Sequence, residues 1–162
     1  MKPSGSCASD KSDEMESIAK QLADTQQCGL YQLTRKPEDV EHAARKAGLA
    51  LFRIDAAHVR DKKGFLDKIA KTLHFPGYFG HNWDALNDCL TDLVWLPAKT
   101  GYVLVFESME HFGARRGQEF SEATEVLRAV SEYWKGQGRP FWAFVAVSSA
   151  WNSTLPFCAF CG

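Results

Sequence analysis

The sequence lacks any apolar run of the roughly 20 residues that a membrane-spanning helix needs. Its first residues, MKPSGSCASDKSDE, lack the apolar core of a secretion signal. It also lacks a basic excess, because 19 Lys and Arg stand against 20 Asp and Glu, so it has no overall electrostatic footprint for nucleic acid. From these absences we expect a cytoplasmic protein that binds neither a membrane nor nucleic acid.

A disulfide framework is also missing. The 5 cysteines are an odd number at no regular spacing, which favours free thiols in a cytoplasmic chain. They are Cys7, Cys28, Cys89, Cys158 and Cys161. The pair Cys158-x-x-Cys161 is weak evidence for zinc, because a structural site needs four ligands and no second pair or nearby histidine completes it. We therefore expect no metal and no cofactor.

The most informative stretch is residues 75–97, FPGYFGHNWDALNDCLTDLVWLP. Its opening Pro76-Gly77 disfavours both helix and strand, and Gly80 breaks the local backbone again. Asn82 is a good N-cap, since its side-chain oxygen can accept a bond from a free helix N–H. A helix is predicted after it, because apolar residues recur at helical spacing. These are Trp83, Leu86, Cys89, Leu90 and Leu93.

Three aspartates occupy the other side of this predicted helix. Asp84, Asp88 and Asp92 are spaced by four residues, and no Lys or Arg lies between Lys71 and Lys99. Like charges at this spacing repel by roughly 0.2–0.5 kcal/mol per pair. The spacing by itself leaves two interpretations open, an ordinary solvated face and a face that binds a partner.

The rest of the chain alternates between predicted strands and helices. We expect a flexible tail over residues 1–26, with at most a short helix near 13–23, and a C-terminal tail over 148–162. Strands are predicted over 29–33, 49–55, 102–106 and 141–147, and helices over 37–47, 61–73 and 120–134. Two of these strands are continuously apolar, as in parallel sheets. The pattern predicts an α/β fold with a small, mainly parallel sheet and helices packed against it.

One long motif resembles the signature of the barstar family, small intracellular protein inhibitors of secreted microbial ribonucleases. It reads Pro76-x-Tyr78-Phe79-Gly80-x-Asn82-Trp83-Asp84-Ala85-Leu86-x-Asp88-Cys89-Leu90-Thr91. The likeness extends more weakly over residues 49–147. It implies a barstar-like domain over 27–147, with its core at 49–147 and an added strand–helix unit before it.

The resemblance implies an inhibitor that is not an enzyme. Such a protein would plug the cationic active site of a barnase-like or other microbial ribonuclease with its acidic helix and the preceding loop, as a monomer in a 1:1 complex and in an immunity or antitoxin role. Asp88 would take the place of the substrate phosphate, and Asp84 would flank it. Tyr78 would stack near the catalytic base, Gly80 and Asn82 would present the loop, and Thr91 would lie near the rim. The remaining predicted contacts are Trp83, Asn87 and, on the 120–134 helix, Glu132.

The motif departs from the best-known family member at several positions. Asn87 replaces a bulky aromatic residue, Trp83 an aliphatic one, Leu93 another aromatic one and Gly136 an acid. An alternative hypothesis is therefore a barstar-fold interaction module for a different partner, such as another nuclease toxin. A carboxylate- or metal-dependent hydrolase built on Asp84 and Asp88 is a third hypothesis, which lacks a suitably spaced histidine.

Overall fold

The computed structural model describes residues 6–77, 79–96 and 100–146, with side chains from residue 13 onward. Along the chain the elements are α1 (Ser6–Leu22), the 3₁₀ helix η2 (Thr25–Gln27), β1 (Leu30–Leu33), α2 (Pro37–Ala47), β2 (Ala50–Asp55), α3 (Lys62–Thr72), α4 (Trp83–Leu90), β3 (Tyr102–Glu107), α5 (Glu110–Arg115), α6 (Gly117–Gly136) and β4 (Phe141–Ala146). The alternation confirms the predicted α/β class.

The strands form one sheet with the order β1-β4-β3-β2, and every pair within it is parallel. β1 is an edge strand and extends the sheet beyond β4. Because the strands are parallel, all four end at the same edge of the sheet. The register places Asp55 opposite Glu107 and Leu33 opposite Ala146 at that edge.

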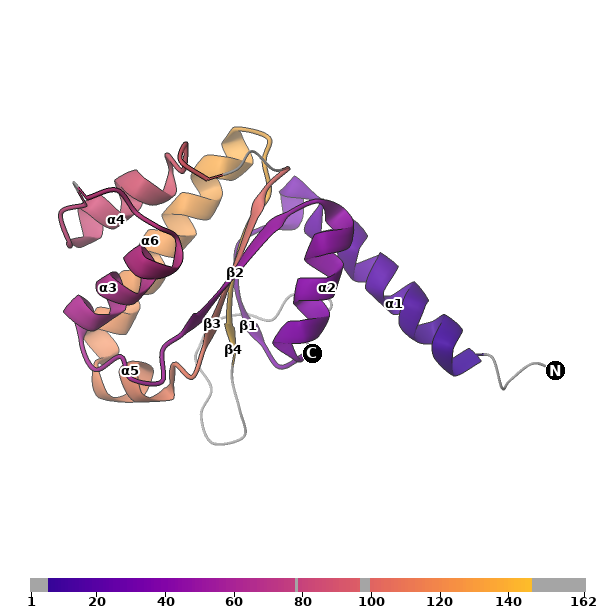
Figure 1. Ribbon diagram of the computed structural model, residues 1–162, viewed down its shortest axis with the longest axis horizontal. Helices are drawn as coiled ribbons and strands as arrows, with labels where there is room; N and C mark the ends of the chain where they lie inside the picture. Colours follow the sequence, from indigo (N-terminus) through magenta and orange to yellow (C-terminus); the bar gives the residue numbers. More distant parts are fainter. Residues whose placement is uncertain (1–5, 78, 97–99, 147–162) are drawn as a thin grey trace.

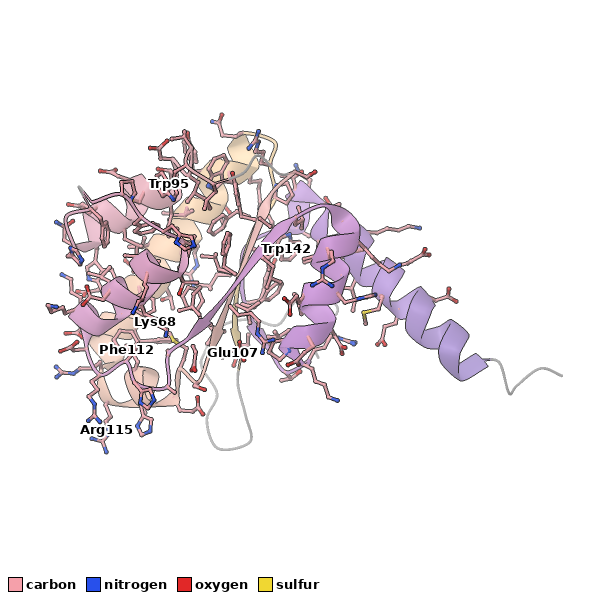
Figure 2. All side chains as sticks on the ribbon, in the orientation of Figure 1. Lys68, Trp95, Glu107, Phe112, Arg115 and Trp142 are labelled. Carbon is pink, nitrogen blue, oxygen red and sulfur yellow. The ribbon has the colours of Figure 1, made fainter. Side chains whose placement is uncertain are left out.

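Helices cover both faces of the sheet (Figure 1). One face packs against α3, α4, α5 and α6 through side chains such as Phe65, Leu86 and Phe112. The other packs against α1 and α2, and Trp142 lies in this second core (Figure 2). The two central strands, β3 and β4, are buried on both faces, which explains their continuous apolar sequences.

The N-terminal segment differs from the predicted loose tail. Residues 6–22 form α1, and its Met15, Ile18 and Leu22 are 5%, 1% and 0% exposed. The indole N–H of Trp142 donates a hydrogen bond of 2.7 Å to the carbonyl of Leu22. The prediction was wrong for this segment because the few apolar residues lie at helical spacing on one side, where even a largely polar helix can be held by packing.

Most other boundaries agree with the sequence to within a few residues. The connection at 109–117, whose structure the sequence did not predict, contains α5, with Phe112 fully buried in the core. The predicted C-terminal tail, 148–162, lies outside the described residues, as do Cys158 and Cys161. Within the described part of the chain, no helix is long and apolar enough to cross a membrane.

Gly101 lies where β3 passes close to the residue that precedes β4. A Cβ added there would overlap the Pro140 carbonyl oxygen and approach Pro140 Cγ at 2.7 Å. That carbonyl also accepts a 3.0 Å bond from the Tyr102 N–H, so it cannot move freely. We expect Gly101→Ala to lower the free energy of unfolding by about 1–3 kcal/mol in urea denaturation, as overpacked cores do.

Gly136, the last residue of α6, provides the control, because a Cβ there meets nothing within 4 Å. Gly136→Ala should leave stability unchanged or raise it by up to about 1 kcal/mol, since alanine is the better helix former. Equal effects of the two substitutions would contradict the steric explanation.

Candidate functional site

The predicted acidic helix is present as α4, and Asn82 caps it. The Asn82 side-chain oxygen accepts a hydrogen bond of 2.7 Å from the backbone N–H of Ala85. Asn82 has an extended backbone (φ −140°, ψ 173°), as N-cap residues do. The helix therefore begins at Trp83, where the sequence predicted it.

The loop before α4 is held by aromatic packing. Phe79 is 6% exposed and contacts Phe75 edge-to-face at 4.9 Å, and Phe75 in turn contacts Trp95 at 5.8 Å. The Trp95 indole donates a 2.9 Å hydrogen bond to the carbonyl of Leu73. Near the end of the loop, His81 Nε2 lies 3.1 Å from the Asp67 carboxylate of α3. These contacts fix the path of the loop on the body of the protein.

Two tryptophans fix α4 against α6. At its start the Trp83 indole donates a hydrogen bond of 2.8 Å to the Glu122 carboxylate. Near its end the Trp134 indole donates one of 2.9 Å to the carbonyl of Leu90. The Lys62 ammonium lies 5.3 Å from the centre of the Trp83 ring. Trp83 is half-buried, so one part of its side chain packs against the core and the rest is available to a partner.

Asp84 and Asp88 on α4 and Asp92, just after the Thr91 C-cap, form what we call the acidic face. The helix therefore ends before Asp92, which the sequence placed on it, and Leu93 has a left-handed backbone (φ 54°). All three aspartates are exposed. Among the described residues, none of their carboxylates accepts a side-chain hydrogen bond or forms an ion pair. No described cation therefore neutralises the acidic face, and its three carboxylates present their charge to solvent.

The charge of the acidic face also affects Cys89 on the inner side of α4. Cys89 is 5% exposed, and burial raises the pKa of its thiol, with the carboxylates of Asp88 and Asp92 raising it further. The thiol stays protonated at neutral pH. Cys28 is likewise buried and unpaired, and its sulfur lies 3.0 Å from the carbonyl of Thr25.

Three other predicted contact residues also lie in this region: Gly80 in the loop, Asn87 in α4 and Thr91 at the C-cap of the helix. Gly80 is exposed in the loop, and the carbonyl of Asn87 accepts a 2.8 Å hydrogen bond from the Thr91 hydroxyl, which ends the helix. Tyr78 lies outside the described residues. The structure thus brings Gly80, Asn82, Trp83, Asp84, Asn87, Asp88 and Thr91 together on one helix and its loop.

Glu132 is placed apart from this group by its contacts. It lies on α6, is exposed, and forms an ion pair of 3.5 Å with Lys135. Burial raises the pKa of Cys28 and of Tyr31, and the Glu132 carboxylate adds to both shifts. No hydrogen bond or ion pair joins Glu132 to α4 in the described structure.

Sequence reasoning missed Glu122, an α6 residue that accepts a hydrogen bond from α4. The spacing of Glu122 along α6 could have shown that it borders the buried side of that helix. Its partner could not be found in this way, because the Trp83 indole is 39 residues away in sequence.

The described side chains contain no group of three or more His, Cys, Asp or Glu that could hold a metal ion.

Asn82 makes the cap testable. Asn82→Ala should lower the free energy of unfolding by about 1 kcal/mol, because the Ala85 N–H loses its acceptor at the start of α4. Asn82→Ser keeps a capping oxygen and should be near neutral in the same urea titration. A full loss in the serine variant would show that the amide has another role.

Comparisons with known proteins agree with this geometry. The family model Barstar (barnase inhibitor) matches residues 49–146, more than half of the chain. The chain is 35% identical over 71 residues to a protein of Bacillus subtilis (strain 168) named "Putative ribonuclease inhibitor YrdF", an alignment that covers 44% of this chain and 74% of that protein.

Solved structures give a more distant likeness. Chains in "Structure of Drosophila ORC bound to DNA" and "Structure of Drosophila ORC bound to AT-rich DNA and Cdc6" match with TM-scores of 0.45 and 0.42 at 12% and 11% identity. The matches cover 85% and 91% of this chain, and 79% and 54% of the other chains. Likeness at this level supports no conclusion about function.

The parallel sheet and the capped acidic helix define an α/β protein related to ribonuclease inhibitors. The chain belongs to the barstar family. Members of this family are inhibitors rather than enzymes.

Proposed function

We propose that this protein inhibits a microbial ribonuclease by inserting α4 and the loop before it into the cationic active site of the enzyme. The observation that carries the proposal is the acidic face, whose three exposed carboxylates have no intramolecular cation among the described residues. A ribonuclease must bind a polyanion, so its active site is cationic and complementary to such a face. The capped helix and the packed loop support the proposal, since a rigid binding element loses little conformational entropy on association.

Asp88 is the proposed substitute for a substrate phosphate. It lies in the middle of the acidic face, with Asp84 one turn before it and Asp92 one turn after it. Its carboxylate would meet the Arg, Lys and His side chains of the enzyme. Further contacts are proposed for Tyr78, Gly80, Asn82, Trp83, Asn87 and Thr91. Clustered charge of one sign also accelerates the encounter with an oppositely charged partner, and the acceleration falls as salt rises.

Glu132 belongs to the proposed interface only if the enzyme reaches across α6. Its ion pair with Lys135 would have to be shared or broken on binding. We therefore propose a minor contribution from Glu132. The 1:1 stoichiometry, the cytoplasmic location and a self-protective role are part of the same proposal.

The proposal is tested by titrating barnase-like and other small microbial ribonucleases with the purified full chain while following cleavage of a fluorogenic RNA. We expect stoichiometric inhibition of at least one of them, with an association rate that falls between low and physiological salt. The chain alone should cleave no RNA, and chelators should change nothing. A folded protein that inhibits no ribonuclease of the panel would contradict the proposal and favour an interaction module with another partner.

A further inference from the structure

A pocket of about 640 Å³ opens at the carboxyl edge of the sheet, away from the residues of the acidic face. It is lined by Ala57, Val59 and Arg60 from the loop after β2, and by His111, Arg115 and Arg116 from α5 and its end. Its volume falls in the range of small-molecule sites, about 300–1,000 Å³. Because β2 and β3 are parallel, both contributing segments leave the sheet at the same edge.

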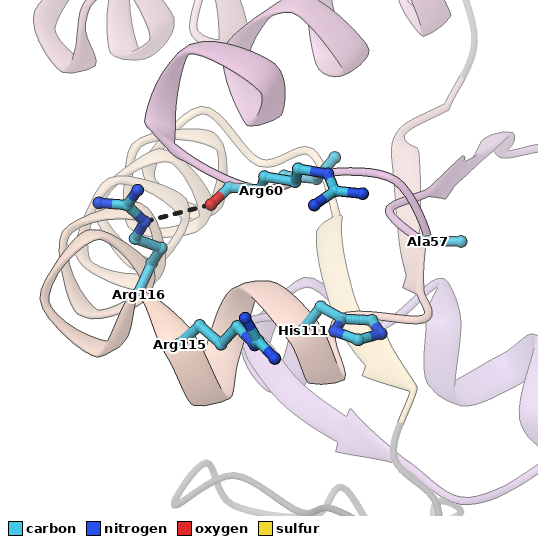
Figure 3. A pocket seen from close by; sticks show the side chains of 6 residues that line it. Ala57, Arg60, His111, Arg115 and Arg116 are labelled. Atoms are coloured by element: carbon cyan, nitrogen blue, oxygen red, sulfur yellow. Dashed lines mark hydrogen bonds between the residues drawn. The ribbon is translucent and has the colours of Figure 1, made fainter.

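Figure 3 shows how the basic side chains lie in this pocket. The guanidinium groups of Arg60 and Arg115 and the imidazole of His111 point into the space between the β2–α3 loop and α5 (Figure 3). Arg116 is held at one side, because its Nε donates a hydrogen bond of 3.2 Å to the carbonyl of Arg60. That bond also ties the β2–α3 loop to the end of α5.

The positive charge of the pocket is not neutralised within the described structure. No carboxylate there lies within ion-pair distance of Arg60, Arg115 or Arg116. Guanidinium groups gathered without a carboxylate repel one another, and an anion bound among them would remove that cost.

Four carboxylates of the adjoining segments already have other partners. Asp55 accepts a 3.0 Å bond from the Ala57 N–H, and Asp61 caps α3 by accepting one of 2.9 Å from the Gly64 N–H. Glu107 binds Arg53 through two hydrogen bonds of 2.6 and 2.9 Å, and Glu119 accepts a 2.7 Å bond from the Lys62 N–H. A fifth acid, Glu110 at the start of α5, forms no ion pair with the arginines of the pocket in the described structure.

We propose that this pocket binds a phosphate group, most suitably the linked phosphates of a small diphosphate. Guanidinium groups match the geometry of phosphate oxygens and bind them through paired hydrogen bonds. Among the described lining residues there is no Phe, Tyr or Trp, so we expect the phosphates rather than a base to supply most of the recognition. This anion site is independent of the acidic face and of ribonuclease inhibition.

The test measures binding of inorganic pyrophosphate to the full chain by isothermal titration calorimetry at physiological salt. We expect saturable 1:1 binding and a higher melting temperature with ligand, because a ligand that binds only the folded state stabilises it. A nucleoside diphosphate should bind about as tightly as pyrophosphate. Arg60→Gln and Arg115→Gln should each weaken binding about tenfold, the scale of one hydrogen bond between charged groups.

Arg128→Gln is the matched control, since Arg128 is an exposed arginine of α6 outside the pocket, and it should leave binding unchanged. Both pocket variants should melt at the wild-type temperature without ligand, because neither side chain forms an ion pair. Absence of saturable pyrophosphate binding, or binding that all three variants retain, would overturn the proposal. So would binding of an RNA oligonucleotide that tightens with length while pyrophosphate does not bind, since that result assigns the basic residues to a nucleic-acid backbone.

Discussion

Asp88→Ala is expected to weaken binding to the inhibited ribonuclease by more than about 2 kcal/mol, or about thirtyfold in Kd. The carboxylate is exposed and has no partner in the described structure, so its removal takes nothing from the free protein. In the complex, the cationic groups that it would meet are left buried and unpaired, and this penalty makes up much of the loss.

The same substitution should leave the fold intact. Removing Asp88 relieves repulsion with Asp84 and Asp92, so the melting temperature should be unchanged or slightly higher. Asp92→Ala is the matched control within the acidic face, because Asp92 follows the last turn of α4 and lies nearer the rim. It should cost much less affinity and act mainly by slowing association at low salt.

The measurement is a binding titration by inhibition or calorimetry, with thermal melts of each variant. Asp88→Asn adds a test of charge against shape, because it keeps the side-chain size and removes the negative charge. Tight binding by the wild type that Asp88→Ala leaves unchanged would refute the phosphate-substitute mechanism without touching the family assignment.

Removal of residues 1–26 is expected to destabilise the protein severely. It would remove Met15, Ile18 and Leu22 from the core on the α1–α2 side. Each of these buried side chains contributes about 1.5–3 kcal/mol to the free energy of unfolding. The truncation would also leave the indole N–H of Trp142 without its carbonyl partner. These lost contacts amount to about 5–9 kcal/mol before the indole is counted, and the entropy cost of ordering α1, which the shorter chain no longer has, offsets part of them. Because a typical domain is stable by only about 5–15 kcal/mol, even part of this loss is severe.

A thermal melt of the truncated chain should therefore show a melting temperature lower by more than about 10 °C, or no cooperative transition. The point variant Ile18→Ala tests the same packing without shortening the chain and should cost about 2–5 kcal/mol. Its control is Ser17→Ala, one residue away on the exposed side of α1, which should change stability by at most about 0.5 kcal/mol. An unchanged melt after truncation would mean that α1 adds nothing to the core.

The acidic face was predictable because its determinants are local. A helix start depends on one side chain accepting one backbone N–H, so Asn82 identified the beginning of α4 from sequence. The spacing of Asp84 and Asp88 then placed them on one side of α4, because a helix repeats every 3.6 residues, whereas Asp92 lies beyond the Thr91 C-cap. The continuous apolar strands likewise indicated a parallel sheet, since a strand covered on both faces has no solvent side.

Other features depend on residues far apart in the chain and could not be predicted from local sequence. The N-terminal segment was predicted to be a tail, because the three buried residues of α1 are stabilised only by packing near Trp142, which is 120 positions away from Leu22. The hydrogen bond between Trp83 and Glu122 likewise forms only because α6 lies beside α4.

The arginine-lined pocket is a further feature that could not be predicted from local sequence. The capped acidic helix and the family motif could be predicted, because each is set by residues within a few turns of one another, and the fold class followed from the alternation of such local elements. The sequence could not show that Arg60 and Arg115 face one space, because they are brought there by the parallel pairing of β2 and β3. Nor could it show that Glu107 and Glu119 are already hydrogen-bonded elsewhere, because hydrogen bonds between distant segments form only when the chain is folded.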